Sequence, residues 1–231
     1  MKKIFLLSIL LVTTVPICFS QGSDVQLKAK KKNTGKDRIV IDVTLDNWAI
    51  GPDSIKNKVF GSRGFGGYFM YDLPFGESGF SISAGAGIGS NNVHNNGVIM
   101  YSVDSATQQK VTSFQQLTTP YKLSKLSLNY VDVPFEIRYR LKADASGEQF
   151  KFALGVKAGY LINSHTKFID SSSKIKTFNI LNVNPYRYGG YVRIGYGWFG
   201  VTGYYSLSGI FLKGKGTDII PFAAGITINP L

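Results

Sequence analysis

The sequence predicts an all-β fold, an eight-stranded antiparallel up-and-down transmembrane β-barrel. Three observations support this prediction. Eight short segments alternate apolar and polar residues, the connections between them alternate long and short, and the N-terminus has the composition of an export signal. Membrane-spanning up-and-down barrels show the first two features, and the third directs a chain out of the cytoplasm.

The clearest alternating segment is 150–163. Phe150, Phe152 and Leu154 begin an apolar face, while Lys151 and Lys157 lie on the opposite one. A period of two residues is that of a β-strand. The same period predicts strands, in chain order, over 39–46, 64–73, 80–88, 126–141, 150–163, 186–196, 199–207 and 222–229. Their apolar faces include, in the same order, Ile41, Phe69, Ile82, Phe135, Leu154, Val192, Val201 and Ile226.

The fourth predicted strand changes phase. Its apolar positions step by three residues from Leu128 to Val131 and by two thereafter. One extra residue near Asn129 and Tyr130, a β-bulge, would restore the facing. A bulge also makes Pro134 tolerable in a paired strand.

The N-terminus predicts a secretory signal peptide over 1–20. Lys2 and Lys3 precede an apolar run, and small residues stand at the positions required for cleavage after Ser20. A lipoprotein anchor through Cys18 is the alternative, but Ile17 stands where that processing requires a small residue. Cleavage removes the one cysteine, so we expect the mature protein to lack thiol chemistry.

The mature chain is expected to contain a basic periplasmic leader over 21–37 and one β-barrel domain over 38–231, because its length suits a single all-β domain. The segment 28–38 (KAKKKNTGKDR) carries part of the net charge of +12. A solvated tail is the simpler interpretation of this segment, and contact with lipid phosphates is the alternative. Lys and Arg are otherwise dispersed, so no nucleic-acid partner is expected.

Connection lengths favour a membrane barrel over a soluble barrel with an apolar interior. The predicted connections are 48–59, 74–79, 90–125, 143–149, 164–184, a tight turn at 197, and 208–219. Long connections at one rim and short ones at the other are the outer-membrane arrangement, with both termini in the periplasm. The strand cations also avoid the apolar face, where lipid contact would cost about 2 to 4 kcal/mol each. We therefore expect an outer-membrane protein in contact with outer-membrane lipid.

The polar face is predicted to fill the barrel interior with structural charges. These are Asp42, Asp46, Asp132, Glu136, Arg138, Arg140, Lys151, Lys157, Arg187 and Arg193. Eight strands enclose a space that side chains can fill, so the charges should pair and plug it. Across the turn at 143–149, Glu136 should lie level with Gly155 and within diagonal reach of Lys157. A proton or ion path through the interior is the alternative.

Catalytic, metal and cofactor motifs are nearly lacking. His94 and His165 are the only histidines in the sequence, and Ser90, Ser164 and Asp170 are near them in sequence. Adjacent strand residues point to opposite faces, so the Ser164-His165 pair does not indicate a catalytic dyad. Two isolated histidines offer no metal-ligand spacing, and no phosphate-binding loop is present in the sequence. We expect no enzymatic activity, no catalytic residue, no metal and no cofactor.

Two segments resemble PorT-like outer-membrane β-barrel proteins. These are NYVDVPFEIRYR at 129–140 and SRGFGGYFMYDLPFGESGFSISAGAGIGSNNV at 62–93. The resemblance follows the strand order over nearly the whole mature chain, and it implies an eight-stranded outer-membrane barrel, with some relatives linked to type IX secretion. One departure is the end of the chain, Asn229-Pro230-Leu231, which lacks the terminal aromatic residue common in such barrels.

Three functions remain compatible with the sequence. The leading one is a structural or surface-interaction protein of the cell envelope that acts through its extracellular loops, with a plugged interior. The first alternative is a component of the type IX secretion or envelope machinery, which would have envelope or secretion proteins as partners. The second is a lipid-modifying enzyme.

Overall fold

The computed structural model describes residues 39–76, 78–105 and 107–228. The predicted signal peptide over 1–20, the leader over 21–37 and the terminal residues 229–231 lie outside the described residues. In the described part of the chain, no helix is long and apolar enough to cross a bilayer.

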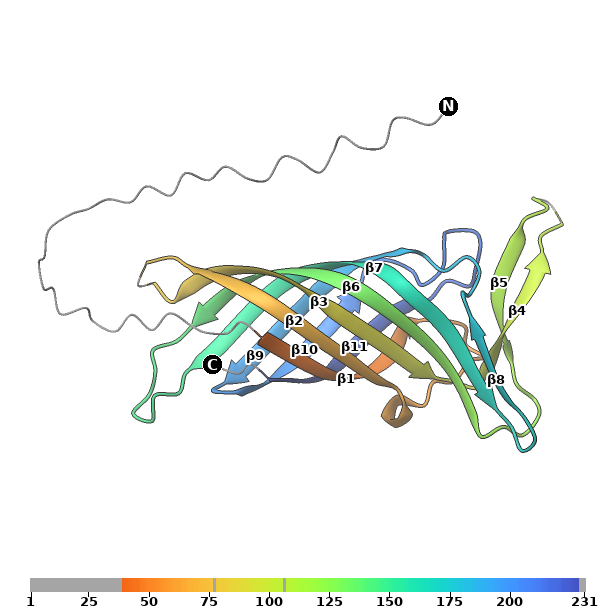
Figure 1. Cartoon of the computed structure of the whole chain (residues 1–231), viewed down its shortest axis with the longest axis horizontal. Helices are drawn as coiled ribbons and strands as arrows, with labels where there is room; N and C mark the ends of the chain where they lie inside the picture. The colour runs from red at the N-terminus through yellow and green to blue at the C-terminus, as the bar shows by residue number, and fades with distance from the viewer. Residues whose placement is uncertain (1–38, 77, 106, 229–231) are drawn as a thin grey trace, which may run out of the picture. The chain divides into compact units, whose positions relative to one another are not determined.

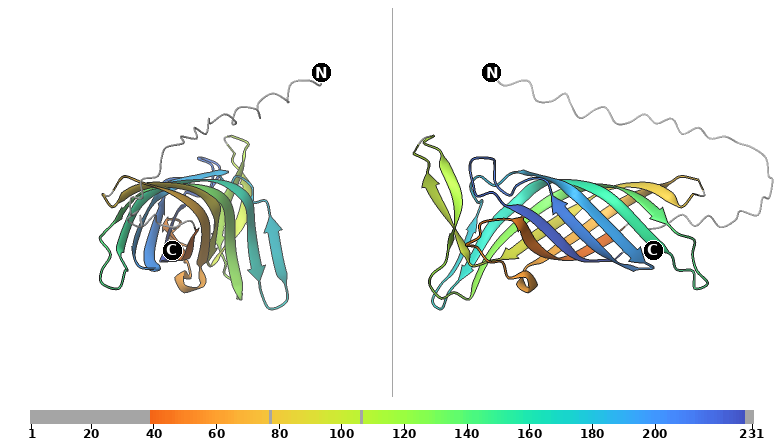
Figure 2. Two further views of the ribbon diagram at one scale, coloured as in Figure 1. Left: turned by 60° about the vertical axis from the view of Figure 1, so that its left-hand side comes forward. Right: turned by 180° about the vertical axis from the view of Figure 1, so that it is seen from behind.

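Eight antiparallel strands form a closed ring (Figures 1 and 2). In ring order they are β1 (Ile39–Ile50), β2 (Arg63–Pro74), β3 (Phe80–His94), β6 (Leu123–Arg140), β7 (Phe150–Ile169), β9 (Tyr186–Tyr196), β10 (Phe199–Ser206) and β11 (Ile220–Ile228). β6 pairs with β7, and β1 pairs with β11 from Ile41↔Ile228 onward, so every ring strand has two neighbours. The eight predicted strands are the eight strands of the ring.

The remaining elements belong to the long connections. β4 (Gly97–Val103) and β5 (Lys110–Gln116) form a separate hairpin, and β8 (Lys174–Phe178) pairs with the final residues of β7. A turn of 3-10 helix, η1 (Val59–Gly61), follows β1. These elements lie at one end of the ring, the long-connection end, and the short connections lie at the other (Figure 1).

Burial alternates along the ring strands, and the apolar side faces outward. On β6, Val133 and Ile137 are 58% and 51% exposed, whereas Asp132 and Glu136 are 0% and 1% exposed. β9 repeats this alternation, with Ile194 outside and Arg193 inside. The distribution is the reverse of that in a water-soluble protein, because the exposed face is apolar and the enclosed one is polar.

The predicted bulge lies at the expected level but on the neighbouring strand. Asn129 pairs with Asn163 while Tyr130 pairs with Leu161, so the extra residue is Ile162 of β7. β6 itself keeps its even-numbered residues buried from Ser124 to Arg138. The prediction of an extra residue in β6 is therefore wrong. The apolar pattern of β6 changes phase because the interior becomes apolar toward the long-connection end, while the facing of β6 stays constant.

An apolar cluster fills the interior at the long-connection end, and we call it the inner cap. Ring strands supply one part of it, and the connections fold back to supply the other. Its buried members are Trp48, Ile55, Val93, Leu126, Leu128, Tyr130, Ile180, Val183, Ile210, Phe211 and Ile219. Phe114 of β5 packs edge-on against Trp48, with the ring centroids 5.2 Å apart. The long connections are thus held over the mouth of the ring by apolar contacts.

Candidate functional site

The charged interior of the ring is the candidate functional site. Asp42, Asp46, Asp132, Glu136, Arg138, Lys151, Arg187 and Arg193 are buried there. The side chains of Arg140 and Lys157 are 12% and 11% exposed and also face inward. All ten predicted interior charges therefore lie on the enclosed face, and eight of them belong to the two networks described below.

The first network, the Glu136 network, links β1, β6 and β9. Glu136 Oε1 accepts a hydrogen bond from Arg138 Nε at 2.5 Å, and Oε2 accepts from Arg193 Nη1 at 2.7 Å. The Tyr191 hydroxyl donates to Oε2 at 2.8 Å. Arg193 Nη2 donates to Asp42 Oδ2 at 2.8 Å. Each carboxylate thus accepts a hydrogen bond from at least one arginine, and this offsets part of the cost of removing both partners from water.

Asp72 of β2 extends this network toward the short-connection end. Asp72 Oδ2 accepts from Arg140 Nη2 at 2.8 Å, and Oδ1 lies 3.5 Å from Arg138 Nη1. The Ser81 hydroxyl accepts from Arg140 Nη1 and donates to Asp72 Oδ1. Lys151 lines a small cavity with Arg138 and Arg140. The sequence prediction omitted Asp72, although the alternation of its strand was sufficient to place it inside.

The second network, the Asp132 network, lies closer to the inner cap. Arg187 Nε and Nη2 donate to the two carboxylate oxygens of Asp132 at 2.9 and 2.5 Å. Arg187 Nη1 also donates to Asn91 Oδ1. The Tyr68 hydroxyl accepts from Lys157 Nζ at 3.0 Å and donates to Asp132 Oδ2 at 3.3 Å. Asp132 is thus bound by a bidentate guanidinium, the geometry that Arg and carboxylate favour.

The expected Glu136–Lys157 pair does not form. Glu136 pairs with Gly155 as predicted, but Lys157 Nζ lies 4.0 Å from Asp132 Oδ2 and 4.4 Å from the centre of the Tyr204 ring. Two guanidinium groups and a phenol already occupy both oxygens of Glu136. The lysine therefore belongs to the Asp132 network.

Asp46 differs from the other interior acids because, among the described residues, no cation forms an ion pair with it. Its carboxylate accepts from the Thr44 hydroxyl and from the backbone amide of Asn92, each at 2.8 Å. The interior charges were expected to pair with one another, but Asp46 is held by neutral donors.

Two interior glycines provide space for the Asp132–Arg187 pair. A Cβ at Gly159 would lie 2.2 Å from Asp132 Oδ1, and a Cβ at Gly89 would lie 2.3 Å from Arg187 Nη2. Any side chain at these positions would displace the ion pair. Glycine at these two positions therefore allows close packing of the ion pair.

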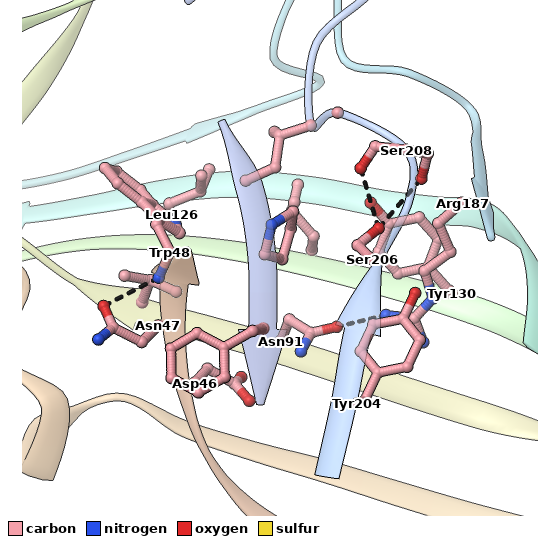
Figure 3. A pocket seen from close by; sticks show the side chains of 16 residues that line it. Asp46, Asn47, Trp48, Asn91, Leu126, Tyr130, Arg187, Tyr204, Ser206 and Ser208 are labelled. Carbon is pink, nitrogen blue, oxygen red and sulfur yellow. Dashed lines mark hydrogen bonds between the residues drawn. The ribbon is translucent and has the colours of Figure 1, made fainter. Parts of the chain in front are cut away.

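A cavity is lined by residues of both the Asp132 network and the inner cap (Figure 3). Its volume is about 470 Å³, counting space open to solvent. Asp46 and Trp48 lie on one side and Ser206 and Tyr204 on the other, and Asn91 reaches across to Arg187 (Figure 3). Charged, hydroxyl and apolar side chains thus all line the cavity.

Ser164 and His165 lie on opposite faces of β7. The Ser164 hydroxyl accepts from the backbone amide of Ile180 in the interior, and His165 Nδ1 lies 3.0 Å from Asn163 Oδ1. Burial and the charges of Lys176 and Lys125 lower the pKa of His165. Burial and four cations, Lys125 first among them, also lower the pKa of His94. Among the described residues, no three His, Cys, Asp or Glu side chains gather as a metal site.

Comparison with known proteins identifies the family. No curated protein and no solved structure matches the chain. The family model described as "Outer membrane protein beta-barrel domain" matches residues 40–212, which is well over half of the sequence and contains the two charged networks. The chain therefore belongs to the outer membrane protein β-barrel domain family.

Proposed function

We propose that this protein is an eight-stranded barrel that spans the outer membrane, is closed by its interior charges, and acts through its extracellular connections as a structural or surface-interaction protein. Family membership supports the outer-membrane location. The outward apolar belt supports direct contact with lipid, because large apolar side chains cover the outer face of all eight strands. In this arrangement the predicted export signal is cleaved after Ser20.

The pairing of buried charges is the main observation in support of a closed interior. The Glu136 and Asp132 networks cross the ring from β1 and β2 to β9, and the inner cap covers them at the long-connection end. Continuous conduction would require these buried ion pairs to separate away from bulk water, which is costly. A closed barrel exposes its connections as its main water-accessible surface.

The long connections are built as one structured surface. Thr112 of β5 exchanges backbone hydrogen bonds with Lys215 and Thr217. The Asn182 side chain donates to the carbonyls of Lys110 and Lys215. Three connections far apart in sequence are therefore tied together, and a preformed surface of this kind suits recognition of a partner.

We propose a binding or structural role in preference to an enzymatic one. Ser164 faces the interior while His165 contacts Asn163 on the other face, and this supports a role other than catalysis by the pair. The type IX secretion machinery remains the alternative, and it is supported by the resemblance of segments 62–93 and 129–140 to PorT-like proteins.

Membrane fractionation and bilayer recording test this function. The protein should require detergent for extraction from outer membranes, should migrate differently on gels before and after heating, and should give no steady conductance in planar bilayers. Steady conductance through the wild-type protein would refute the closed interior, and recovery without detergent would refute the membrane location. Copurification with a defined set of secretion proteins would favour the alternative.

A further inference from the structure

A row of basic side chains crosses four strands at the long-connection end. His94 of β3 pairs with Lys125 of β6, Lys125 with Lys167 of β7, and Lys167 with Lys176 of β8. We call these four residues the basic row. Directly opposed like charges destabilise a sheet, so this row is unfavourable for the stability of the isolated protein.

The basic row faces outward, on the same side of the sheet as the apolar belt. β6 exposes Val131 and Val133, and its even-numbered residues stay buried as far as Ser124, so Lys125 is on the outward side with the two valines. On β7, the extra residue Ile162 shifts the facing so that Lys167 shares this side. The row therefore lies beyond the belt on the outer surface, separate from the charged interior.

No carboxylate neutralises the row among the described residues. The paired segments 90–94, 123–129, 163–169 and 174–178 contain no Asp or Glu. The nearby Asp170 accepts hydrogen bonds from the amides and hydroxyls of Ser172 and Ser173 in its own turn. Partial burial and the charges of Lys167 and Lys176 lower the pKa of Lys125, as expected for uncompensated positive charge.

Two of the lysines bend toward the apolar belt. Lys125 Nζ donates to Asn92 Oδ1 at 2.9 Å, and Lys176 Nζ lies 4.5 Å from the centre of the Phe178 ring. Asn92 and Phe178 belong to the next outward row toward the belt, which runs through Ser127. With a rise of about 3.4 Å per residue along each strand and a strand tilt of about 40°, the basic row lies about 10 to 15 Å beyond the last apolar rows, measured along the ring axis. The ammonium groups thus point toward the level of lipid headgroups.

We propose that the basic row binds the phosphate groups of a phosphorylated glycolipid in the outer leaflet of the membrane. The orientation in this proposal rests on the proposed function, which places the long connections outside. Phosphate supplies the negative charge that this part of the protein lacks, and a side-on position above the apolar belt suits a lipid held in the membrane. Arg63 and Lys58, whose charges also act on His94, extend the positive field.

A charge-neutral triple variant tests the proposal. Lys125→Gln, Lys167→Gln and Lys176→Gln together remove three charges from the row. The matched control is Lys110→Gln, Lys142→Gln and Lys213→Gln, which removes three charges from exposed positions elsewhere. Each protein is refolded in phosphatidylcholine vesicles containing diphosphorylated lipid A or its dephosphorylated form, and bound glycolipid is measured after purification.

The wild type and the control should retain the diphosphorylated lipid equally, and the row variant should bind it more weakly by on the order of fivefold for each lysine removed. The difference should shrink at high salt and vanish with the dephosphorylated lipid. Equal retention by the row variant, or complete displacement by inorganic phosphate, would overturn the proposal; the second result would identify a site for free anions. Heat-modifiable migration of all three proteins keeps these outcomes distinct from a failure to insert, which would refute the proposed function instead.

Discussion

At the scale of single residues, the pairing of the interior charges depends on which cationic side chains reach each carboxylate and on how many donors they carry. Glu136 and Lys157 are close in register, but Arg138 and Arg193 carry donors that reach both oxygens of Glu136. Lys157 has one charged nitrogen, which lies between Asp132 and the Tyr204 ring. Glu136 is thus bound by arginines, whose planar side chains carry several donors, and Lys157 lies beside Asp132 instead.

The contacts of Glu136 predict which double-mutant cycle shows coupling. Glu136→Gln should lower the free energy of unfolding by roughly 3 to 5 kcal/mol, because Arg193 loses a buried charged partner. The cycle with Arg193→Met should show coupling, because both substitutions remove the same ion pair, whereas the cycle with Lys157→Met should be nearly additive. Urea unfolding in detergent micelles measures both cycles. Stronger coupling of Glu136 to Lys157 than to Arg193 would show that the observed pairing is wrong.

The close fit around Asp132 predicts a second residue-scale effect. Gly159→Ala should destabilise the barrel by about 1 to 3 kcal/mol, because the new methyl group would overlap Asp132 Oδ1. Gly190→Ala is the matched control, since its Cβ would meet only the Gly155 carbonyl oxygen at 3.9 Å. Thermal unfolding of the two variants in the same detergent distinguishes them. Equal stability would mean that the Asp132–Arg187 pair can shift at little cost.

At the scale of elements, the ring strands were predictable from sequence and the connections were not. A strand with one face toward each environment alternates strictly, as in the segment from Phe150 to Ile162. The inner cap takes apolar residues, such as Ile55 and Phe211, from connections where no period indicates their burial. Their burial depends on contacts between connections that are far apart in sequence, so the local sequence pattern could not predict that these residues are buried.

The same contacts change where a protease should cut. The sequence marks Asn91 to Gly97 as the start of a long polar connection, but β3 continues to His94, and Asn95 is 1% exposed. Surface protease on intact cells should therefore cut in the β4–β5 turn at 104–109 and spare 91–97. Mass spectrometry of the released fragments gives the sites. Early cleavage within 91–97 would show that the long connections are not held over the ring.

At the scale of the whole molecule, the sequence indicated which face of the sheet is apolar and could not show which charges meet. The alternation placed all ten expected charges on one face, and the structure encloses that face. Partner choice depends on strand register around the closed ring, as the Arg193–Asp42 contact between β9 and β1 illustrates. Such a contact spans 151 residues of sequence and arises only when the ring closes.

The orientation of the whole molecule in the membrane predicts a labelling pattern. The sequence contains one cysteine, at position 18 in the predicted signal peptide, so a single introduced cysteine can report on one position. Ser105→Cys lies in the β4–β5 turn at the long-connection end. Ala145→Cys lies in the turn between β6 and β7 at the short-connection end. Both positions are exposed. A membrane-impermeant maleimide should label Ser105→Cys on intact cells and label Ala145→Cys only after the outer membrane is broken. The reverse labelling pattern would mean that the barrel has the opposite orientation in the membrane. The basic row would then lie against the inner leaflet, and phospholipid phosphates would replace the glycolipid as its partner.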